Sequence, residues 1–151
     1  MGMKGDRFML FSALFGVWLA TLFTQLMLVR HGYPSSFWIE MNPLFDVAFR
    51  RGLAWVQPLA NIGISMLLYG LFKISQSNRV KLAIISRTLL YGLGFGYLVN
   101  GLNDLLAYVA YMSLPFYAGQ LAVVFGGIIG GVVNLRMVLK NRLATAGVKY
   151  L

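Results

Sequence analysis

Residues 8–29 read FMLFSALFGVWLATLFTQLMLV, a run of 22 residues without a charged side chain. A bilayer core about 30 Å thick requires about 20 apolar residues in a helix. Backbone polar groups must be paired inside lipid, and the run lacks the alternation of a barrel strand. It therefore predicts a membrane-spanning helix.

Three further apolar runs follow, at residues 52–72, 88–112 and 116–139. The connections at 75–81 and 114–115 are short, which favours antiparallel neighbours in sequence. We expect one domain over residues 1–151, an all-α, up-down bundle of four transmembrane helices. The first span should lie beside the second, and the third beside the fourth.

The composition excludes several protein classes. Of the 151 residues, 59% are hydrophobic and 11% are charged, whereas soluble domains carry about 25% charged residues. The chain has no cysteine and one histidine, His31. Disulfides, thiolate nucleophiles, iron–sulfur clusters, cysteine-based zinc sites and bis-histidine haem are thereby excluded within this sequence. We expect no metal, no cofactor and no catalytic set of a known kind.

Basic residues gather at one side of the predicted spans. Ten of the thirteen lie there: Lys4, Arg7, Lys73, Arg79, Lys81, Arg87, Arg136, Lys140, Arg142 and Lys149. The other three are Arg30, Arg50 and Arg51. The positive-inside rule then places both termini in the cytoplasm. The net charge of +9 indicates contact with anionic lipid headgroups on the cytoplasmic side, and not a nucleic-acid surface.

The first outer loop, residues 30–51, contains a helix signal. Asn42 is a favoured N-cap and Pro43 suits the first helical position. Asp46 in the first turn and Arg50 and Arg51 in the last turn complement the helix dipole, and Gly52 can end the helix. The apolar face comprises Leu44, Phe45, Ala48 and Phe49. We expect a short interfacial helix at about 43–51; an aromatic belt that includes Phe37 and Trp38 is the alternative.

Polar side chains in the spans concentrate in their outer halves. At 1.5 Å per residue, they lie about 6 to 18 Å below the outer face. They are Gln25, Gln57, Asn61, Asn100, Asn103, Asp104 and Gln120. The inner halves hold few comparable groups apart from Asn134. Polar groups are costly in lipid, so we expect an outward-facing polar pocket, flanked by Tyr97, Tyr108 and Tyr111, beside a kink at Pro58.

Asp104 is the one acid inside a predicted span. It should be protonated, paired with Arg30, Arg50 or Arg51, or reached by water or a cation. The competing interpretation is that Asp104, Asn100 and Asn103 join helices by hydrogen bonds without binding a ligand.

Glycines predict close helix contacts in the last span. Gly126, Gly127, Gly130 and Gly131 form two overlapping small-xxx-small pairs, which fit packing within the chain or a homo-oligomer seam. The Gly92–Gly94–Gly96 run does not follow a strand and lies in a span, so it is not a nucleotide loop.

Residues 40–44, Glu-Met-Asn-Pro-Leu, carry a resemblance. The stretch from about Thr21 to Phe72 resembles an uncharacterised family of small four-helix membrane proteins with a Glu-x-Asn-Pro-Leu motif in the first loop. The resemblance implies the four-helix architecture and no particular activity. The family's acid in the first span is absent here, where Thr21 and Thr24 stand.

Three functions fit these features. The first is a protein that binds or passes a small solute or ion through the outer polar pocket, as a homo-oligomer. The second is a non-catalytic subunit of a larger membrane complex. The third is a lipid-acting enzyme with Asp104 and Glu40 as acid and base, which requires both carboxyls within reach of one substrate.

Overall fold

The computed structural model describes residues 2–34, 42–115 and 117–145, and this part of the chain is helical and contains no strand. The helices are α1 (Gly2–His31), α2 (Pro43–Arg50), α3 (Val56–Ser75), α4 (Val80–Ala110) and α5 (Ala118–Thr145). Within these residues four helices, α1, α3, α4 and α5, are long and apolar enough to cross a membrane. The predicted all-α membrane fold with a short helix in the first loop is confirmed.

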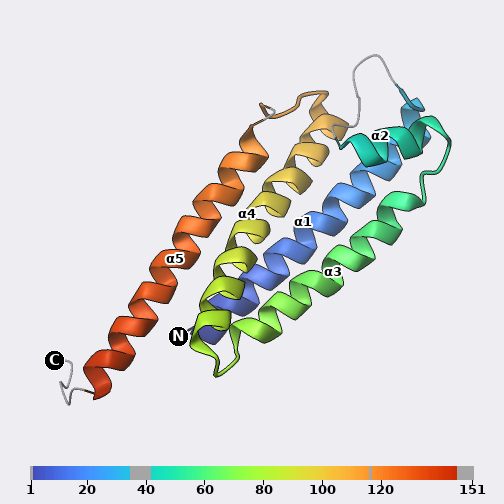
Figure 1. The fold of residues 1–151 in the computed structure, drawn as a ribbon. Coiled ribbons are helices and arrows are strands. Elements are labelled where there is room, and N and C mark those ends of the chain that lie inside the picture. Colours follow the sequence, from blue (N-terminus) through green and yellow to red (C-terminus); the bar gives the residue numbers. More distant parts are fainter. Residues whose placement is uncertain (1, 35–41, 116, 146–151) are drawn as a thin grey trace.

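Helix α4 is the central element of the bundle (Figure 1). It packs most closely against α1 and α5, and α3 completes the assembly beside α1 and α4. The predicted neighbours in sequence do touch, but the closest pair is α1 and α4, which run parallel. We call the end where α1 begins and α5 ends the terminal end, and the opposite end, which carries α2, the α2 end.

Two glycines bring α1 and α4 together. A Cβ atom at Gly101 would lie 2.5 Å from the carbonyl oxygen of Gly16, and a Cβ atom at Gly16 would collide with the carbonyl group of Tyr97. The backbones therefore touch at a point where no other residue fits. This contact sets the spacing of the two helices through the middle of the bundle.

The glycines of α5 divide between two faces. Added Cβ atoms at Gly126 and Gly130 would collide with the α4 backbone near Tyr91 and Thr88. Added Cβ atoms at Gly127 and Gly131 would meet nothing within 4 Å. One glycine pair therefore packs α5 onto α4, while the other lies on the side facing away.

Helices α3 and α4 begin at residues other than the predicted starts of their spans. Helix α3 begins at Val56 rather than at residue 52, so Pro58 lies in the first turn. First-turn amides have no intrahelical acceptor, so the predicted kink has no basis. Helix α4 begins at Val80, eight residues before the predicted start, and Arg87 lies two turns inside it.

The short helix α2 forms as its sequence predicts. The side chain of Asn42 accepts a hydrogen bond from the Leu44 amide at 3.0 Å, and Gly52 adopts a positive φ of 72° just after the helix. Ala48 and Phe49 are buried, whereas Leu44 is exposed. Ring contacts of Phe49 with Phe45 and Tyr33 fix the helix at the α2 end.

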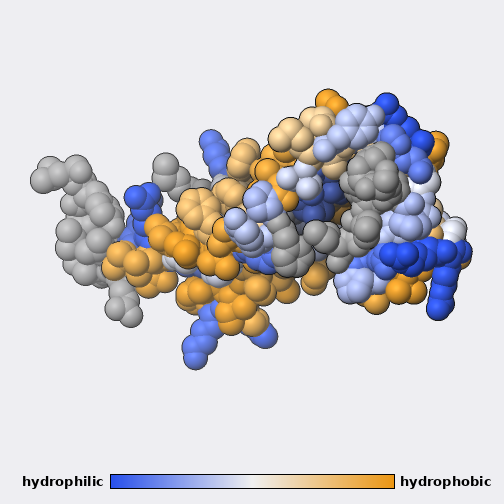
Figure 2. All heavy atoms as spheres, turned by 90° about the horizontal axis from the view of Figure 1, so that it is seen from above, coloured by the Kyte–Doolittle hydropathy of each residue, from blue (hydrophilic) through white to orange (hydrophobic). Residues whose placement is uncertain are grey.

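Buried side chains form layers along the bundle axis. An apolar cluster in α1, α3 and α4 occupies the middle and terminal half: Met9, Leu10, Ala13, Val17, Leu68, Phe72, Leu90 and Tyr91. Seen from above, most hydrophilic residues lie toward the α2 end, and hydrophobic residues dominate the opposite part, where α5 runs (Figure 2). Polar layers lie on both sides of this cluster, and they contain the candidate sites.

Candidate functional site

Three polar side chains of α1 point to partners on other helices near the α2 end. Thr21 and Gln25 lie one turn apart and contact α3, while Thr24 contacts α4. The spacing of these residues presents all three near one face of the helix. We call Thr21, Thr24, Gln25 and their partners the outer pairs.

The contact of Thr21 with α3 is buried and those of Gln25 are partly buried. The Asn61 amide donates to the Thr21 hydroxyl at 2.6 Å, and that hydroxyl donates to the carbonyl oxygen of Val17 at 2.8 Å. The Gln25 amide donates to the side-chain oxygen of Gln57 at 3.1 Å and to the carbonyl oxygen of Ala54 at 3.0 Å. These bonds join α1 to α3 at two successive turns.

The contact with α4 involves the predicted acid. The Thr24 hydroxyl donates to a carboxylate oxygen of Asp104 at 3.2 Å. Thr24 is buried and Asp104 is half-buried, so the carboxyl group lies at the edge of the α1–α4 seam. Thr21 and Thr24 each supply a hydroxyl to these contacts.

The other predicted pocket residues lie elsewhere. The side-chain oxygen of Asn103 accepts a hydrogen bond from the Leu114 amide at 2.6 Å, so it fastens the α4–α5 connection. Asn100 and Gln120 are exposed. The structure thus brings Gln25 to Gln57, Asn61 to Thr21 and Asp104 to Thr24, rather than all seven predicted residues to one another.

An arginine of α1 lies against two tyrosine rings near the α2 end of the α1–α4 seam. The guanidinium carbon of Arg30 lies 5.6 Å from the ring centre of Tyr108 and 5.9 Å from that of Tyr111. Tyr108 also packs against Phe23, with ring centres 5.3 Å apart. Cation–π contacts of this kind favour a cation held over the ring faces.

The loop charges pair with each other. Arg50 donates to both oxygens of Asp46, at 3.1 and 3.0 Å, and the Tyr33 hydroxyl also bonds to Asp46. The hydrogen bond from Arg50 holds the pKa of the Asp46 carboxyl below its ordinary value of 3.8, and Tyr33 lowers that pKa further. The guanidinium of Arg50 lies over the Tyr33 ring. Arg51, the C-cap of α2, is exposed.

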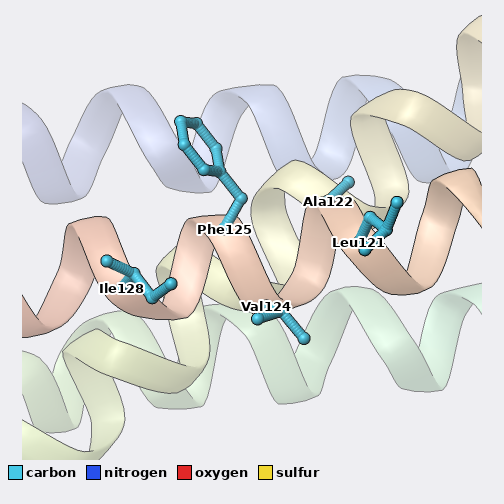
Figure 3. A pocket seen from close by; sticks show the side chains of 5 residues that line it. All are labelled: Leu121, Ala122, Val124, Phe125 and Ile128. Carbon is cyan, nitrogen blue, oxygen red and sulfur yellow. The ribbon is translucent and has the colours of Figure 1, made fainter.

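Two hollows lie on the outside of the bundle. The first, of about 440 Å³, is lined by Leu121, Ala122, Val124, Phe125 and Ile128. All five side chains project from α5, as Figure 3 shows. The second, of about 430 Å³, lies between α1 and α3 and includes Trp18 and Tyr69. Apolar side chains dominate both linings, so neither hollow is the polar pocket that the sequence predicts.

The strongest polar cluster lies at the terminal end, where the sequence predicted little. Asp6 is fully buried and Arg87 is 5% exposed. The Arg87 Nε atom donates to both Asp6 oxygens, at 2.9 and 3.0 Å. The prediction that Asp104 is the one acid within a span is wrong, because Asp6 lies inside α1. Arg87 does not flank a connection, because it lies inside α4.

Residues of α3 and α5, the remaining long helices, also bond to this ion pair. The other two guanidinium nitrogens of Arg87 donate to the Asn134 side-chain oxygen and to the Ser75 carbonyl oxygen, both at 2.8 Å. The Ser75 hydroxyl donates to Asp6 at 3.0 Å. The Asn134 amide donates to Thr88 and to the carbonyl of Ile84, both at 3.0 Å. We call Asp6, Ser75, Arg87, Thr88 and Asn134 the terminal network.

A sequence signal for the terminal network existed. The depth estimate that aligned Gln25 with Gln57 also aligns Asp6 with Ser75, at about 35 Å from the outer face, once the helices extend beyond their apolar cores. An acid and a hydroxyl at one depth on α1 and α3 indicate a shared buried cluster. The same estimate puts Arg87 about 10 Å deeper than Asn134, so it does not reveal that contact. The apolar runs alone ended too early to reveal the cluster.

In the described part of the chain, no group of three or more His, Cys, Asp or Glu residues could hold a metal ion. Glu40, the proposed partner of Asp104 in a lipid-acting enzyme, lies outside the described residues, as do Phe37 and Trp38.

Protein-family models, curated proteins and solved structures were each compared with this chain, and none of them matches it. The resemblance carried by residues 40–44 therefore stays a prediction. Fold and composition identify the chain as a polytopic α-helical membrane protein.

Proposed function

We propose that this membrane protein binds and passes a small cation, or a small solute with a positive group, at Asp104. The ligand approaches from the α2 end, which the distribution of basic residues predicts to be the outer side. The observation that carries the proposal is the half-buried carboxyl group of Asp104 on the α1–α4 seam, with the hydroxyl of Thr24 as donor.

The two intramembrane acids support this assignment by contrast. Asp6 is fully buried and its charge is matched by Arg87. Asp104 is half-buried and accepts a hydrogen bond from the Thr24 hydroxyl. Acids within spans are costly and mark ion or substrate sites by default, and a carboxylate at an accessible seam attracts cations.

The test is an exchange of Asp104 for its uncharged isostere. Asp104→Asn keeps an oxygen that accepts from Thr24 but removes the charge. In proteoliposomes, we expect uptake of Na⁺ or of protons, followed with an enclosed fluorescent dye, to fall at least tenfold. Asp46→Asn, which removes an acid at the same end, should leave uptake unchanged. Equal uptake by the wild type and Asp104→Asn would exclude the proposal.

A second candidate, a subunit of a larger membrane assembly, is favoured by one observation on α5. Among the described helices α5 packs closely against α4 alone. Gly127 and Gly131 lie where an added Cβ atom meets nothing within 4 Å. Small residues on a free face allow another membrane helix to approach.

This candidate is tested by chemical crosslinking in native membranes. A cysteine introduced at Gly131 should crosslink to a second membrane chain, and a cysteine at Gly63 on α3 serves as the matched control. Recovery of an uncrosslinked single chain from both variants would argue against an assembly through α5.

A further inference from the structure

The outer surface of the α1–α3 seam holds a hollow that the proposed function does not use. Its volume is about 430 Å³, and its lining includes Leu14 and Trp18 of α1 and Ile62, Met66, Tyr69 and Gly70 of α3. A Cβ atom at Gly70 would meet nothing within 4 Å, so none of the described helices covers the groove there. At this depth in a membrane, its neighbours are lipid chains.

A lysine lies at one end of this groove. The ammonium group of Lys73 lies 5.4 Å from the ring centre of Tyr69, one of the lining residues. Lys73 follows Tyr69 by four residues and Met66 by seven, so the three share one stripe of α3. The cation therefore marks the terminal end of the apolar groove.

Arg7 supplies a second charge at the same level. It precedes Leu14 by seven residues, so both lie on one stripe of α1. The hydrogen bond between Asp6 and Ser75, at 3.0 Å, fixes the register of α1 against α3 at that end. Arg7 and Lys73 are both exposed, and neither belongs to the two ion pairs found among the described residues.

We propose that this groove is a binding site for an anionic phospholipid of the leaflet at the terminal end. One acyl chain lies against Trp18, Met66 and Tyr69, and the phosphate lies between Lys73 and Arg7. The acid nearest in register, Asp6, is bonded to Arg87, so the two cations need an external anion. Basic residues beside a span attract anionic headgroups.

Charge also selects the phospholipid over a second copy of the chain. A two-fold contact through this face would place the Lys73 and Arg7 groups of one copy beside those of the other. Like charges in contact are destabilising. An anionic lipid instead neutralises them and fills the apolar part of the groove with a hydrocarbon chain.

Trp18 provides a direct reporter. The chain has three tryptophans, so Trp38→Phe and Trp55→Phe leave Trp18 as the sole fluorophore. Vesicles of phosphatidylcholine receive a small fraction of brominated-chain phosphatidylglycerol or brominated-chain phosphatidylcholine. We expect the brominated phosphatidylglycerol to quench Trp18 at several-fold lower concentration than the brominated phosphatidylcholine.

Two charge variants distinguish a specific lipid site at Lys73 from a general attraction of anionic lipids to basic residues at this end. Lys73→Gln should raise the phosphatidylglycerol concentration for half-quenching about fivefold, as expected for one basic group beside an anionic headgroup. Lys81→Gln, which removes an exposed charge at the start of α4 at the same end, should change it little. Far-UV circular dichroism verifies that both variants keep their helices.

A third variant tests the groove itself. Gly70→Leu places a side chain in open space and should reduce quenching by both brominated lipids. The proposal is overturned if the two lipids quench the wild type equally, or if Lys73→Gln and Lys81→Gln weaken quenching equally. Weak quenching by both lipids, with Trp18 shielded by a second copy, would also overturn it.

Discussion

The outer pairs and the terminal network both join helices through polar groups, but they are built differently. In the terminal network one guanidinium bonds to α1, α3 and α5 at once, and the groups around it bond to each other. In the outer pairs each α1 side chain has its own partner on α3 or α4. The first arrangement closes one end of the bundle; the second leaves the Asp104 carboxyl group half-buried.

The comparison separates a structural role from a ligand role. A buried ion pair in which all three guanidinium nitrogens are engaged within the protein leaves little for a ligand to bind, and removal of one partner leaves a buried charge. Pairs with separate partners can exchange a protein bond for a ligand bond at lower cost. This difference is why the proposed binding site is placed at Asp104 and not at the stronger cluster.

The largest expected effect comes from removing the arginine of the terminal network. Arg87→Met should lower the free energy of unfolding in detergent micelles by about 3–5 kcal/mol, because Asp6 is left buried without its counter-charge. The measurement is loss of helical circular dichroism on titration with SDS.

Two further variants sharpen that result. Replacing both partners, Asp6→Leu with Arg87→Met, should recover much of the loss, since apolar pairs often replace buried ion pairs without penalty. Arg136→Met removes an exposed charge from α5 and should have little effect. If Arg87→Met lowers the free energy of unfolding only slightly, the terminal network does not have the structural role that distinguishes it from the outer pairs.

The next effect concerns the glycine contact that holds both regions in register. Gly101→Ala places a Cβ atom 2.5 Å from the Gly16 carbonyl oxygen, so the backbones must separate, at a cost of about 1–3 kcal/mol. Gly63→Ala, where nothing lies within 4 Å, should not destabilise the protein. The same SDS titration measures both, and equal stability of the two variants would contradict the close contact.

Double-mutant cycles test the connectivity directly. Thr24→Val and Asn61→Leu remove contacts with no shared partner, so their costs, about 0.6 kcal/mol each, should add within about 0.5 kcal/mol. Asp6→Asn and Asn134→Leu both act on Arg87 and should couple by about 0.5–3 kcal/mol. Strong coupling in the first cycle would show that the outer pairs form one network.

The smallest effect lies in the loop. In the folded structure Arg50 and Tyr33 lower the pKa of Asp46. The ionised carboxyl group therefore stabilises the folded loop at pH values above the ordinary carboxyl pKa. This stabilisation is lost as the pH falls through the lowered value. Amide exchange of α2 should therefore accelerate below about pH 3.8 relative to α3. Arg50→Gln should reduce that pH dependence. If the exchange rate of α2 depends on pH in the same way in this variant as in the wild type, the assigned role of Arg50 is refuted.

Local signals in the sequence predicted local structure well. Asn42 and Pro43 predicted the start of α2, and Gly52 predicted its end, because capping depends on neighbouring residues alone. The four apolar runs predicted the number of spanning helices, since span length follows from bilayer thickness.

Contacts between distant helices were harder to predict. The parallel α1–α4 contact depends on Gly16 meeting Gly101, and glycines occur in several spans without facing a neighbour, as at Gly63 and Gly127. Depth alone does not say which of the seven polar residues face one another, because helical rotation decides which side a residue faces; Asn100 and Gln120, for example, are exposed. Arg87 was placed outside the helix because the apolar run begins at residue 88, whereas the helix itself begins at Val80.

The parallel packing of α1 against α4 has a consequence for biosynthesis. As the chain leaves the ribosome, α1 emerges with Asp6, and the residue that neutralises Asp6 emerges 81 positions later. Until then Asp6 lacks the counter-charge that Arg87 supplies in the finished bundle. Nascent chains halted before residue 87 should accordingly be recognised by membrane quality control, and chains extended past α4 should escape it.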